Sequence, residues 1–181
     1  LGDPGSYGVG MIYLPQDSAG QKRCEQALHE IVTSEGLTVI GWRTVPVNPE
    51  PLGKTARDCM PLVRQIFIDR GEDIDDDLAF ERKLYVIRRR AETAIRYSSE
   101  AQDAEFYIPS LSCRTIVYKG MVLAPNLAKY YLDFQDPKFA TAIALFHQRF
   151  STNTFPSWRL AQPGVHDIAQ AVAKKVEAQH D

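Results

Sequence analysis

The stretch HQRFSTNTFPSW, from His147 to Trp158, decides how the fold of this chain is interpreted. It follows the apolar run Ala142–Phe146 and gathers a histidine, an arginine and several hydroxyl and amide side chains around a proline. An apolar strand that ends in such a cluster usually delivers polar groups to a surface or to a pocket. The remainder of the sequence has to distinguish between these two cases.

Size and composition indicate one soluble globular domain. The chain has 181 residues, of which 44% are hydrophobic and 24% are charged. Its formal net charge of -2 gives no electrostatic reason to expect nucleic acid or an anionic membrane as a partner. No apolar run approaches the roughly 20 residues that cross a bilayer, and the start, LGDPGSYG, lacks the features of a signal peptide.

The cysteines point to a reducing compartment. Cys24, Cys59 and Cys113 are odd in number and far apart, so they predict neither a disulfide framework nor a CxxC metal site. We therefore expect a cytoplasmic location.

Hydrophobic patterns predict one α+β domain. Strand composition between turn signals marks Tyr7–Leu14, Leu37–Val47, Leu62–Ile68, a hairpin of Glu105–Ser110 with Arg114–Tyr118, and a last strand at Ala142–Phe150. Apolar residues at helical spacing predict a helix through Cys24–Val32 that ends near Gly36. A second helix has its inner face within Phe80–Ile95, and a short one is expected near Leu127–Leu132.

Three features that resemble binding sites have simpler explanations. Gly8–Gly10 lacks the third glycine and the following helix of a dinucleotide-binding motif, so we interpret it as strand sequence. The side chains of Arg88–Arg90 point about 100° apart on a helix, which indicates a solvated face rather than a phosphate clamp. The acidic run Asp73–Asp77 lacks the pattern of an EF-hand loop and instead complements the dipole at a helix start.

The cluster after the last strand has the chemistry of an amino-acid site. The planar guanidinium of Arg149 can give a carboxylate two parallel hydrogen bonds. Ser151, Thr152 and Asn153 add donors and acceptors that suit the α-carboxylate and α-amino groups of an amino acid. Alternatively, these residues only satisfy a buried loop while Phe155, Pro156 and Trp158 fill the core. The chemistry of the residues leaves both interpretations open.

Similarity to a known family favours the first interpretation. HQRFSTNTFPSW, continued by Leu160–Pro163, resembles the hallmark segment of the glutamine amidotransferase domain in the glutamate synthase large subunit. Further segments resemble that family in the same order: YGVGMIYLPQD (Tyr7–Asp17), EGLTVIGWRTVPV (Glu35–Val47), FERKLYVIRRRAE (Phe80–Glu92) and FYIPSLSCRTIVYKGM (Phe106–Met121). The resemblance covers about residues 4 to 163.

The resemblance implies a class II glutamine amidotransferase with the N-terminal-nucleophile hydrolase fold, a sandwich of antiparallel sheets flanked by helices. In that family the domain hydrolyses glutamine to glutamate and ammonia, and the ammonia passes through a channel to aminate 2-oxoglutarate. The implied cofactors belong to the parent protein: FMN, an iron–sulfur cluster, and NADPH or ferredoxin as reductant. No cofactor is expected in this chain. The implied partners are glutamine, the remaining domains of the large subunit, and a reductase subunit or ferredoxin.

The same resemblance assigns site residues and domain limits. Arg149 matches the arginine that grips the α-carboxylate of glutamine, Thr152 matches a residue that lines the pocket, and Phe150 and Asn153 are neighbours that shape it. Residues 1–163 are expected to form a partial amidotransferase domain. Residues 164–181 have no counterpart in the family and are expected to form an amphipathic helical tail.

Parts of the family's catalytic machinery have no match. The family's nucleophile is a cysteine at the mature N-terminus whose α-amino group serves as base, whereas residue 1 here is Leu1. The His-Asn-Gly motif of the oxyanion hole is missing after Pro163. We therefore expect this chain alone to be inactive. A non-catalytic binding or scaffold module derived from such a domain is the alternative, and a purely structural domain in which Arg149 pairs with an internal acid is a third hypothesis.

Overall fold

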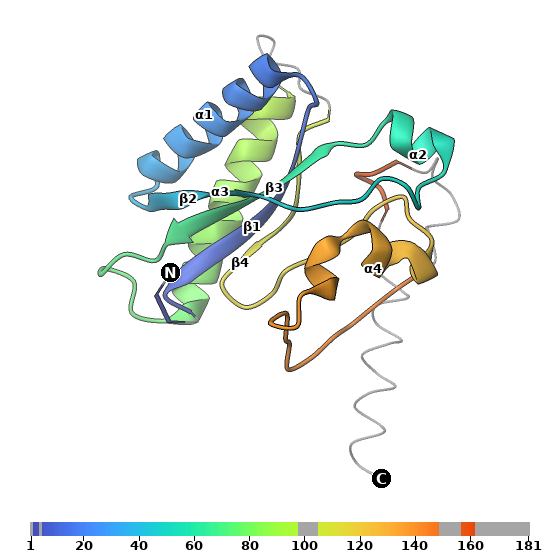
Figure 1. Cartoon of the computed structure of the whole chain (residues 1–181). Coiled ribbons are helices and arrows are strands. Elements are labelled where there is room, and N and C mark those ends of the chain that lie inside the picture. Colours follow the sequence, from blue (N-terminus) through green and yellow to red (C-terminus); the bar gives the residue numbers. More distant parts are fainter. Residues whose placement is uncertain (1, 4, 98–104, 149–156, 162–181) are drawn as a thin grey trace. The chain divides into compact units, whose positions relative to one another are not determined.

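The computed structural model describes residues 2–3, 5–97, 105–148 and 157–161. The chain divides into two units, one formed by Leu1–Val45 and Pro61–Tyr118, the other by Pro46–Met60 and Lys119–Asp181. The predicted α+β class is confirmed, because an antiparallel sheet is combined with helices (Figure 1). None of the described helices has the length and apolar character that a membrane crossing demands.

A four-stranded antiparallel sheet organises the first unit. β1 (Tyr7–Leu14) pairs with β3 (Leu62–Asp69) along its full length and with β4 (Tyr107–Ser112) on its other side. β2 (Thr38–Thr44) pairs with the free side of β3, which gives the order β2-β3-β1-β4. The strands at residues 7–14 and 62–68 were predicted correctly, and β2 is shorter than its predicted range.

Two helices cover one face of this sheet (Figure 1). α1 (Ser18–Ser34) begins at Asp17, whose Oδ1 accepts a hydrogen bond from the amide of Gly20 at 2.7 Å, and Gly36 with φ +79° follows its end. α3 (Asp77–Arg96) begins at Asp76, which caps the amide of Ala79. Their apolar stripes pack on the sheet in one core, which includes Ile12, Leu14, Leu28, Val32, Ile66, Ile68, Phe80, Leu84, Ile87 and Ile108.

The glycines of β1 allow close packing on this face. A Cβ on Gly8 would lie 2.7 Å from Cδ1 of Leu84 in α3, and one on Gly10 would lie 2.6 Å from Cγ2 of Ile66 in β3. Gly8–Gly10 is therefore strand sequence that makes room for neighbouring side chains, as we predicted.

The predicted hairpin after residue 105 is wrong. β4 pairs with β1, and residues 114–118 form no strand. The cause is local: Oγ of Ser112 accepts hydrogen bonds from the amides of Arg114 at 3.0 Å and Thr115 at 3.1 Å, and Oγ of Ser110 accepts one from the amide of Val117 at 3.0 Å. These side-chain contacts turn the chain and replace the backbone ladder of a hairpin.

The predicted last strand is also wrong over its described part. Residues 142–148 have no strand partner among the described residues, and residues 149–150 lie outside them. Ile143, Leu145 and Phe146 are 68%, 65% and 87% exposed. Strand composition alone does not form a strand, because the backbone groups need a neighbouring strand.

The second unit is built from short helical segments. α2 (Lys54–Asp58) lies in the connection between β2 and β3, whereas the 3₁₀ helix η1 (Ala124–Asn126), α4 (Leu127–Tyr130) and the 3₁₀ helix η2 (Leu132–Gln135) come much later in the chain. A bridge between Val47 and Tyr131, and a 2.8 Å hydrogen bond from the amide of Asn48 to the carbonyl of Tyr130, join the two parts. α4 confirms the short helix predicted near residue 127. The tail at residues 164–181 lies outside the described residues.

Candidate functional site

The residues predicted to bind glutamine lie outside the part of the chain that the structure describes. These are Arg149, Phe150, Thr152 and Asn153, and their roles stay predictions. The structure describes both ends of the stretch HQRFSTNTFPSW: residues 147–148 precede the gap and residues 157–158 follow it. The candidate site is therefore built from the residues that hold the C-terminal end of the stretch.

Trp158 anchors the C-terminal end of the stretch in the second unit. Its side chain is 5% exposed, and its indole Nε1 donates a buried hydrogen bond to the carbonyl of Ala56 at 2.9 Å. Its ring packs on that of Tyr130, with 5.5 Å between the centroids. An aromatic ring whose polar atom is paired and whose apolar surface is covered has a single well-defined position.

Gly120 leaves the space that this indole needs. A Cβ on Gly120 would lie only 2.4 Å from Cζ3 of Trp158 and 3.0 Å from its Cε3. Any side chain at position 120 would therefore displace the indole.

Two adjacent tyrosines complete this buried cluster. The hydroxyl of Tyr131 donates a hydrogen bond to the carbonyl of Lys119 at 2.7 Å. The hydroxyl of Tyr130 is buried and has no hydrogen-bond partner among the described residues. Burial raises the pKa of the Tyr130 phenol well above its ordinary value of 10.0, so the group is neutral at physiological pH. Tyr130 and Tyr131 are both fully buried and their rings meet edge to face at 4.6 Å.

Cys113 does not have the surroundings of an activated nucleophile. Burial, together with the hydrogen bond to Glu81, raises the pKa of the Cys113 thiol to about 11. Cys24 is buried in the apolar core, and Cys59 is exposed with its thiol donating to the carbonyl of Thr55 at 3.0 Å. Reactive cysteines need a lowered pKa or a cationic neighbour.

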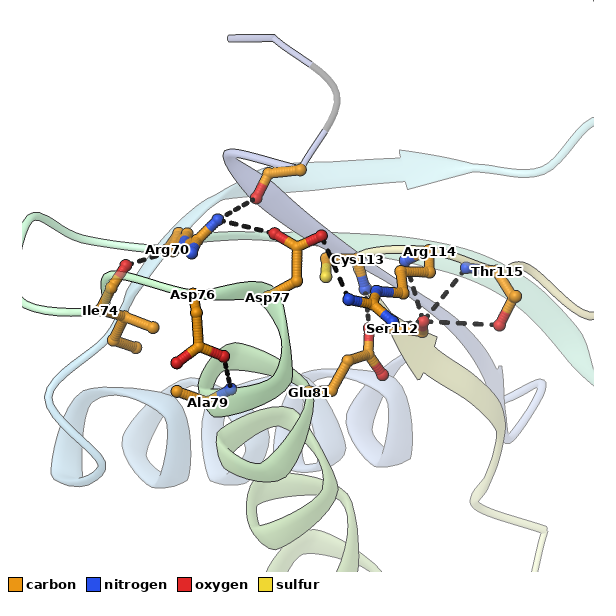
Figure 2. A network of polar contacts seen from close by, with 11 residues as sticks. Arg70, Ile74, Asp76, Asp77, Ala79, Glu81, Ser112, Cys113, Arg114 and Thr115 are labelled. Carbon is orange, nitrogen blue, oxygen red and sulfur yellow. Dashed lines mark hydrogen bonds and ion pairs between the residues drawn. The ribbon is translucent and has the colours of Figure 1, made fainter.

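A polar network joins the start of α3 to the end of β4 (Figure 2). Oε1 of Glu81 accepts hydrogen bonds from the hydroxyl of Ser112 and the amide of Cys113, both at 2.7 Å. Burial opposes ionisation of Glu81, but these hydrogen bonds outweigh it and lower the pKa of its carboxyl below the ordinary 4.5. Arg70 donates to Asp77 at 2.9 Å and to the carbonyls of Ile74 and Gly5 at 2.8 and 3.3 Å. Because these donors are used within the protein, the network is structural.

Two hollows in the first unit bring no reactive groups together. One, of about 350 Å³, lies beside Arg70, and four of its lining residues are the acids Asp3, Asp69, Glu72 and Asp77. The other, of about 650 Å³, lies along α1 and is lined by Lys22, Arg23, Glu25, Gln26, His29 and Trp42. Among the residues that the structure describes, no three His, Cys, Asp or Glu side chains are grouped to hold a metal ion.

Sequence reasoning offered a buried Trp158 only within the alternative interpretation, and it missed the residues that receive the indole. Ala56, Gly120 and Tyr130 lie far from Trp158 in the sequence, and only Gly120 falls within a segment that resembles the family. The glycine in YKGM was the one usable signal, because an isolated glycine can mark a close approach of another segment.

Comparison with known proteins places the chain in a family. The family model of the class-II glutamine amidotransferases matches residues 1–167. The large chain of NADPH glutamate synthase from Bacillus subtilis (strain 168) is 46% identical over 157 residues, which are 87% of this chain and 10% of that protein. Ferredoxin-dependent glutamate synthase 1 from Arabidopsis thaliana is 46% identical over 157 residues, 86% of this chain and 9% of that protein. Ferredoxin-dependent glutamate synthase 2 from Synechocystis is 43% identical over 161 residues, 89% of this chain and 10% of that protein.

The chain thus spans about a tenth of the length of these relatives. The family match, in contrast, extends over almost the whole chain and includes both described units. The segments that resembled this family in the sequence all fall within the matched residues. The chain belongs to the class-II glutamine amidotransferases.

Proposed function

We propose that this chain is a portion of the glutamine amidotransferase domain of a glutamate synthase. The observation that carries the proposal is the 46% identity, over 87% of the chain, to a glutamate synthase large chain. In the proposed reaction, water hydrolyses the side-chain amide of glutamine to give glutamate and ammonia. The ammonia then aminates 2-oxoglutarate elsewhere in the parent protein.

Arg149 is the proposed anchor for glutamine. Its guanidinium would hold the α-carboxylate through two parallel charge-assisted hydrogen bonds. Thr152 would line the pocket, and Phe150 and Asn153 would shape it. The proposal is supported by the chemistry of these side chains and by the anchored position of Trp158, which follows them in the chain.

The domain limits are part of the proposal. Residues 1–163 would form the amidotransferase portion, and residues 164–181 a helical tail. The family match continues to residue 167, so the first residues of the tail overlap with it.

The proposed cofactors act in other parts of the parent protein. FMN and an iron–sulfur cluster would transfer electrons from NADPH or from ferredoxin, the reductants named for the relatives. A [2Fe–2S] or [4Fe–4S] cluster is usually held by four cysteines, whereas this chain has three. The ligands of the proposed cluster would therefore lie in other parts of the parent protein. The proposed partners are glutamine, the remaining domains of the large subunit, and a reductase subunit or ferredoxin. We propose no nucleic acid and no membrane as a partner.

The location that we propose is the cytoplasm. The structure shows no disulfide between the three cysteines, all of which it describes, and this suits a reducing compartment. The relative from Oryza sativa is named as chloroplastic, so organelle targeting varies among the proteins that this chain resembles.

Calorimetry with L-glutamine on the 181-residue chain tests the proposal, together with a glutaminase assay on the same sample. We expect binding of L-glutamine that is lost in Arg149→Ala, and only partly restored in Arg149→Lys because an ammonium lacks the planar fork. Since Cys24, Cys59 and Cys113 are internal and have no free α-amino group to serve as base, we expect no release of glutamate. If Arg149→Ala binds glutamine as tightly as the unchanged chain, the assigned carboxylate site is wrong.

A further inference from the structure

The side of α3 that faces away from the sheet carries exposed apolar side chains. Leu78, Tyr85, Val86 and Tyr97 are all exposed, with values of 58% for Leu78 and 61% for Tyr85. They recur at helical spacing, opposite the buried stripe of α3 that packs in the core. Single exposed apolar residues are common on protein surfaces, whereas several on one helix face indicate an interaction surface.

Two arginines lie among these residues. Arg82 is three residues before Tyr85 and Arg89 is four residues after it, so the three side chains are neighbours on one face. Arg82 is exposed, and the side chain of Arg89 is 61% exposed. Arginine and tyrosine are both enriched at protein–protein interfaces. The surface is called the outer face of α3 below, and it is formed by Leu78, Arg82, Tyr85, Val86, Arg89 and Tyr97.

Positive charge is in excess on this helix. α3 contains six arginine and lysine residues against three aspartate and glutamate residues. Glu81 accepts its hydrogen bonds from residues at the end of β4, and Glu92 is buried and shared between Arg88 and Arg89. Because one carboxylate meets two guanidinium groups, positive charge remains available to an acidic partner.

Neighbouring charges restrict the partner to a short acidic element. Asp73, Asp75 and Asp76 are exposed directly before α3. These acids would repel the extended anionic surface of a membrane or a nucleic acid that lay along the whole helix. A helix packed beside the later turns of α3 can place its carboxylates on the arginines and avoid these acids.

We propose that the outer face of α3 binds an acidic amphipathic helix of a partner protein. Apolar side chains of the partner would pack on Leu78 and Tyr85, and its carboxylates would pair with Arg82 and Arg89. One pair of helices buries less area than a standard interface, so we expect a dissociation constant on the order of 10 μM. None of the residues proposed to bind glutamine takes part, so the inference does not depend on the glutamine site.

Fluorescence anisotropy with a labelled synthetic peptide tests this on the 181-residue chain. The probe is an amphipathic helix of about three heptads, with leucine on its apolar face and glutamate at the flanking positions. A second peptide carries lysine in place of each glutamate. We expect the lysine peptide to bind at least about ten times more weakly than the glutamate peptide. Binding of the glutamate peptide should weaken as the salt concentration rises, because salt screens exposed charges.

Two matched arginines separate the proposed face from the rest of the surface. Arg82 is the sixth residue of α3 and Arg23 is the sixth residue of α1, and both are exposed. Arg82→Glu should weaken binding of the glutamate peptide about tenfold, whereas Arg23→Glu should change it less than about twofold. Tyr85→Ala should also weaken binding about tenfold, because tyrosine is a frequent anchor at interfaces. The urea midpoint of each variant controls for unfolding.

Equal binding of the two peptides, or no binding of either, would overturn the acidic partner. Equal weakening by Arg82→Glu and Arg23→Glu would overturn the choice of face. Binding to phosphatidylserine vesicles without binding of the glutamate peptide would assign the face to a membrane and reject the proposal. Failure of the proposed function is seen separately, as absent L-glutamine binding in calorimetry, and it leaves the peptide titration unchanged.

Discussion

The adjacent residues Tyr130 and Tyr131 should respond in opposite directions to the same change. Both are fully buried, but only Tyr131 has a described partner for its hydroxyl, the carbonyl of Lys119 at 2.7 Å. Replacing each tyrosine with phenylalanine removes one oxygen atom and keeps the ring contacts. The pair therefore compares the free energy of a paired hydroxyl with that of a hydroxyl that has no partner among the described residues.

The expected magnitudes follow from these contacts. Leaving a buried polar group unpaired costs about 1–3 kcal/mol, so Tyr130→Phe removes a destabilising group. The space vacated by one oxygen costs a few tenths of a kcal/mol at about 24 cal/mol per Å³. The net effect of Tyr130→Phe is a stabilisation of about 1 kcal/mol. Tyr131→Phe removes a hydrogen bond and leaves the Lys119 carbonyl without it, which should destabilise the chain by about 1–3 kcal/mol.

Urea unfolding measures both effects. With a slope of about 2 kcal/mol/M, Tyr130→Phe should raise the midpoint by about 0.5 M without changing the slope, and Tyr131→Phe should lower it. Equal destabilisation by both variants would refute the reasoning, because it would show that the Tyr130 hydroxyl has a partner of comparable strength.

Three other groups have testable consequences. Because the pKa of Glu81 is lowered, its ionised form contributes stability that is present above pH 4.5 and is lost as the pH falls through the folded pKa. In urea unfolding, the unchanged chain should therefore lose more stability than Glu81→Gln between about pH 5 and pH 3. Equal losses in the two proteins would contradict this. A thiol reagent at about pH 8 should modify the exposed Cys59 quickly and Cys113 and Cys24 slowly, and a second fast thiol would be inconsistent with the raised pKa of Cys113. Asp17→Ala should lower the free energy of unfolding by about 1 kcal/mol because it removes the cap of α1, and an unchanged urea midpoint would mean that the cap contributes little.

Local patterns predicted the elements whose cause is local. β1, α1 and α3 follow from strand composition, helical spacing, acidic residues at a helix start and a glycine after a helix end. The hairpin prediction failed because Ser110 and Ser112 use their hydroxyls to bind the backbone of the next residues, which composition does not reveal. The strand predicted at Ala142–Phe150 failed over residues 142–148 because a strand depends on a neighbour distant in sequence.

The candidate site divides in the same way. The chemistry of Arg149 and its neighbours is readable from residue types and from family resemblance. The buried position of Trp158 cannot be derived in this way, because the residues that contact its indole lie in different segments. These residues are Ala56, Gly120 and Tyr130. These residues come together around the indole of Trp158 only when the chain folds.

The contact between Trp158 and Ala56 also constrains how the protein is made. The two residues are 102 positions apart in the chain. At a synthesis rate of about 5–20 residues per second, Ala56 waits roughly 5–20 s on the ribosome before its partner has been added. During this interval α2 lacks the indole that later covers it, and the nascent chain is open to chaperones and proteases.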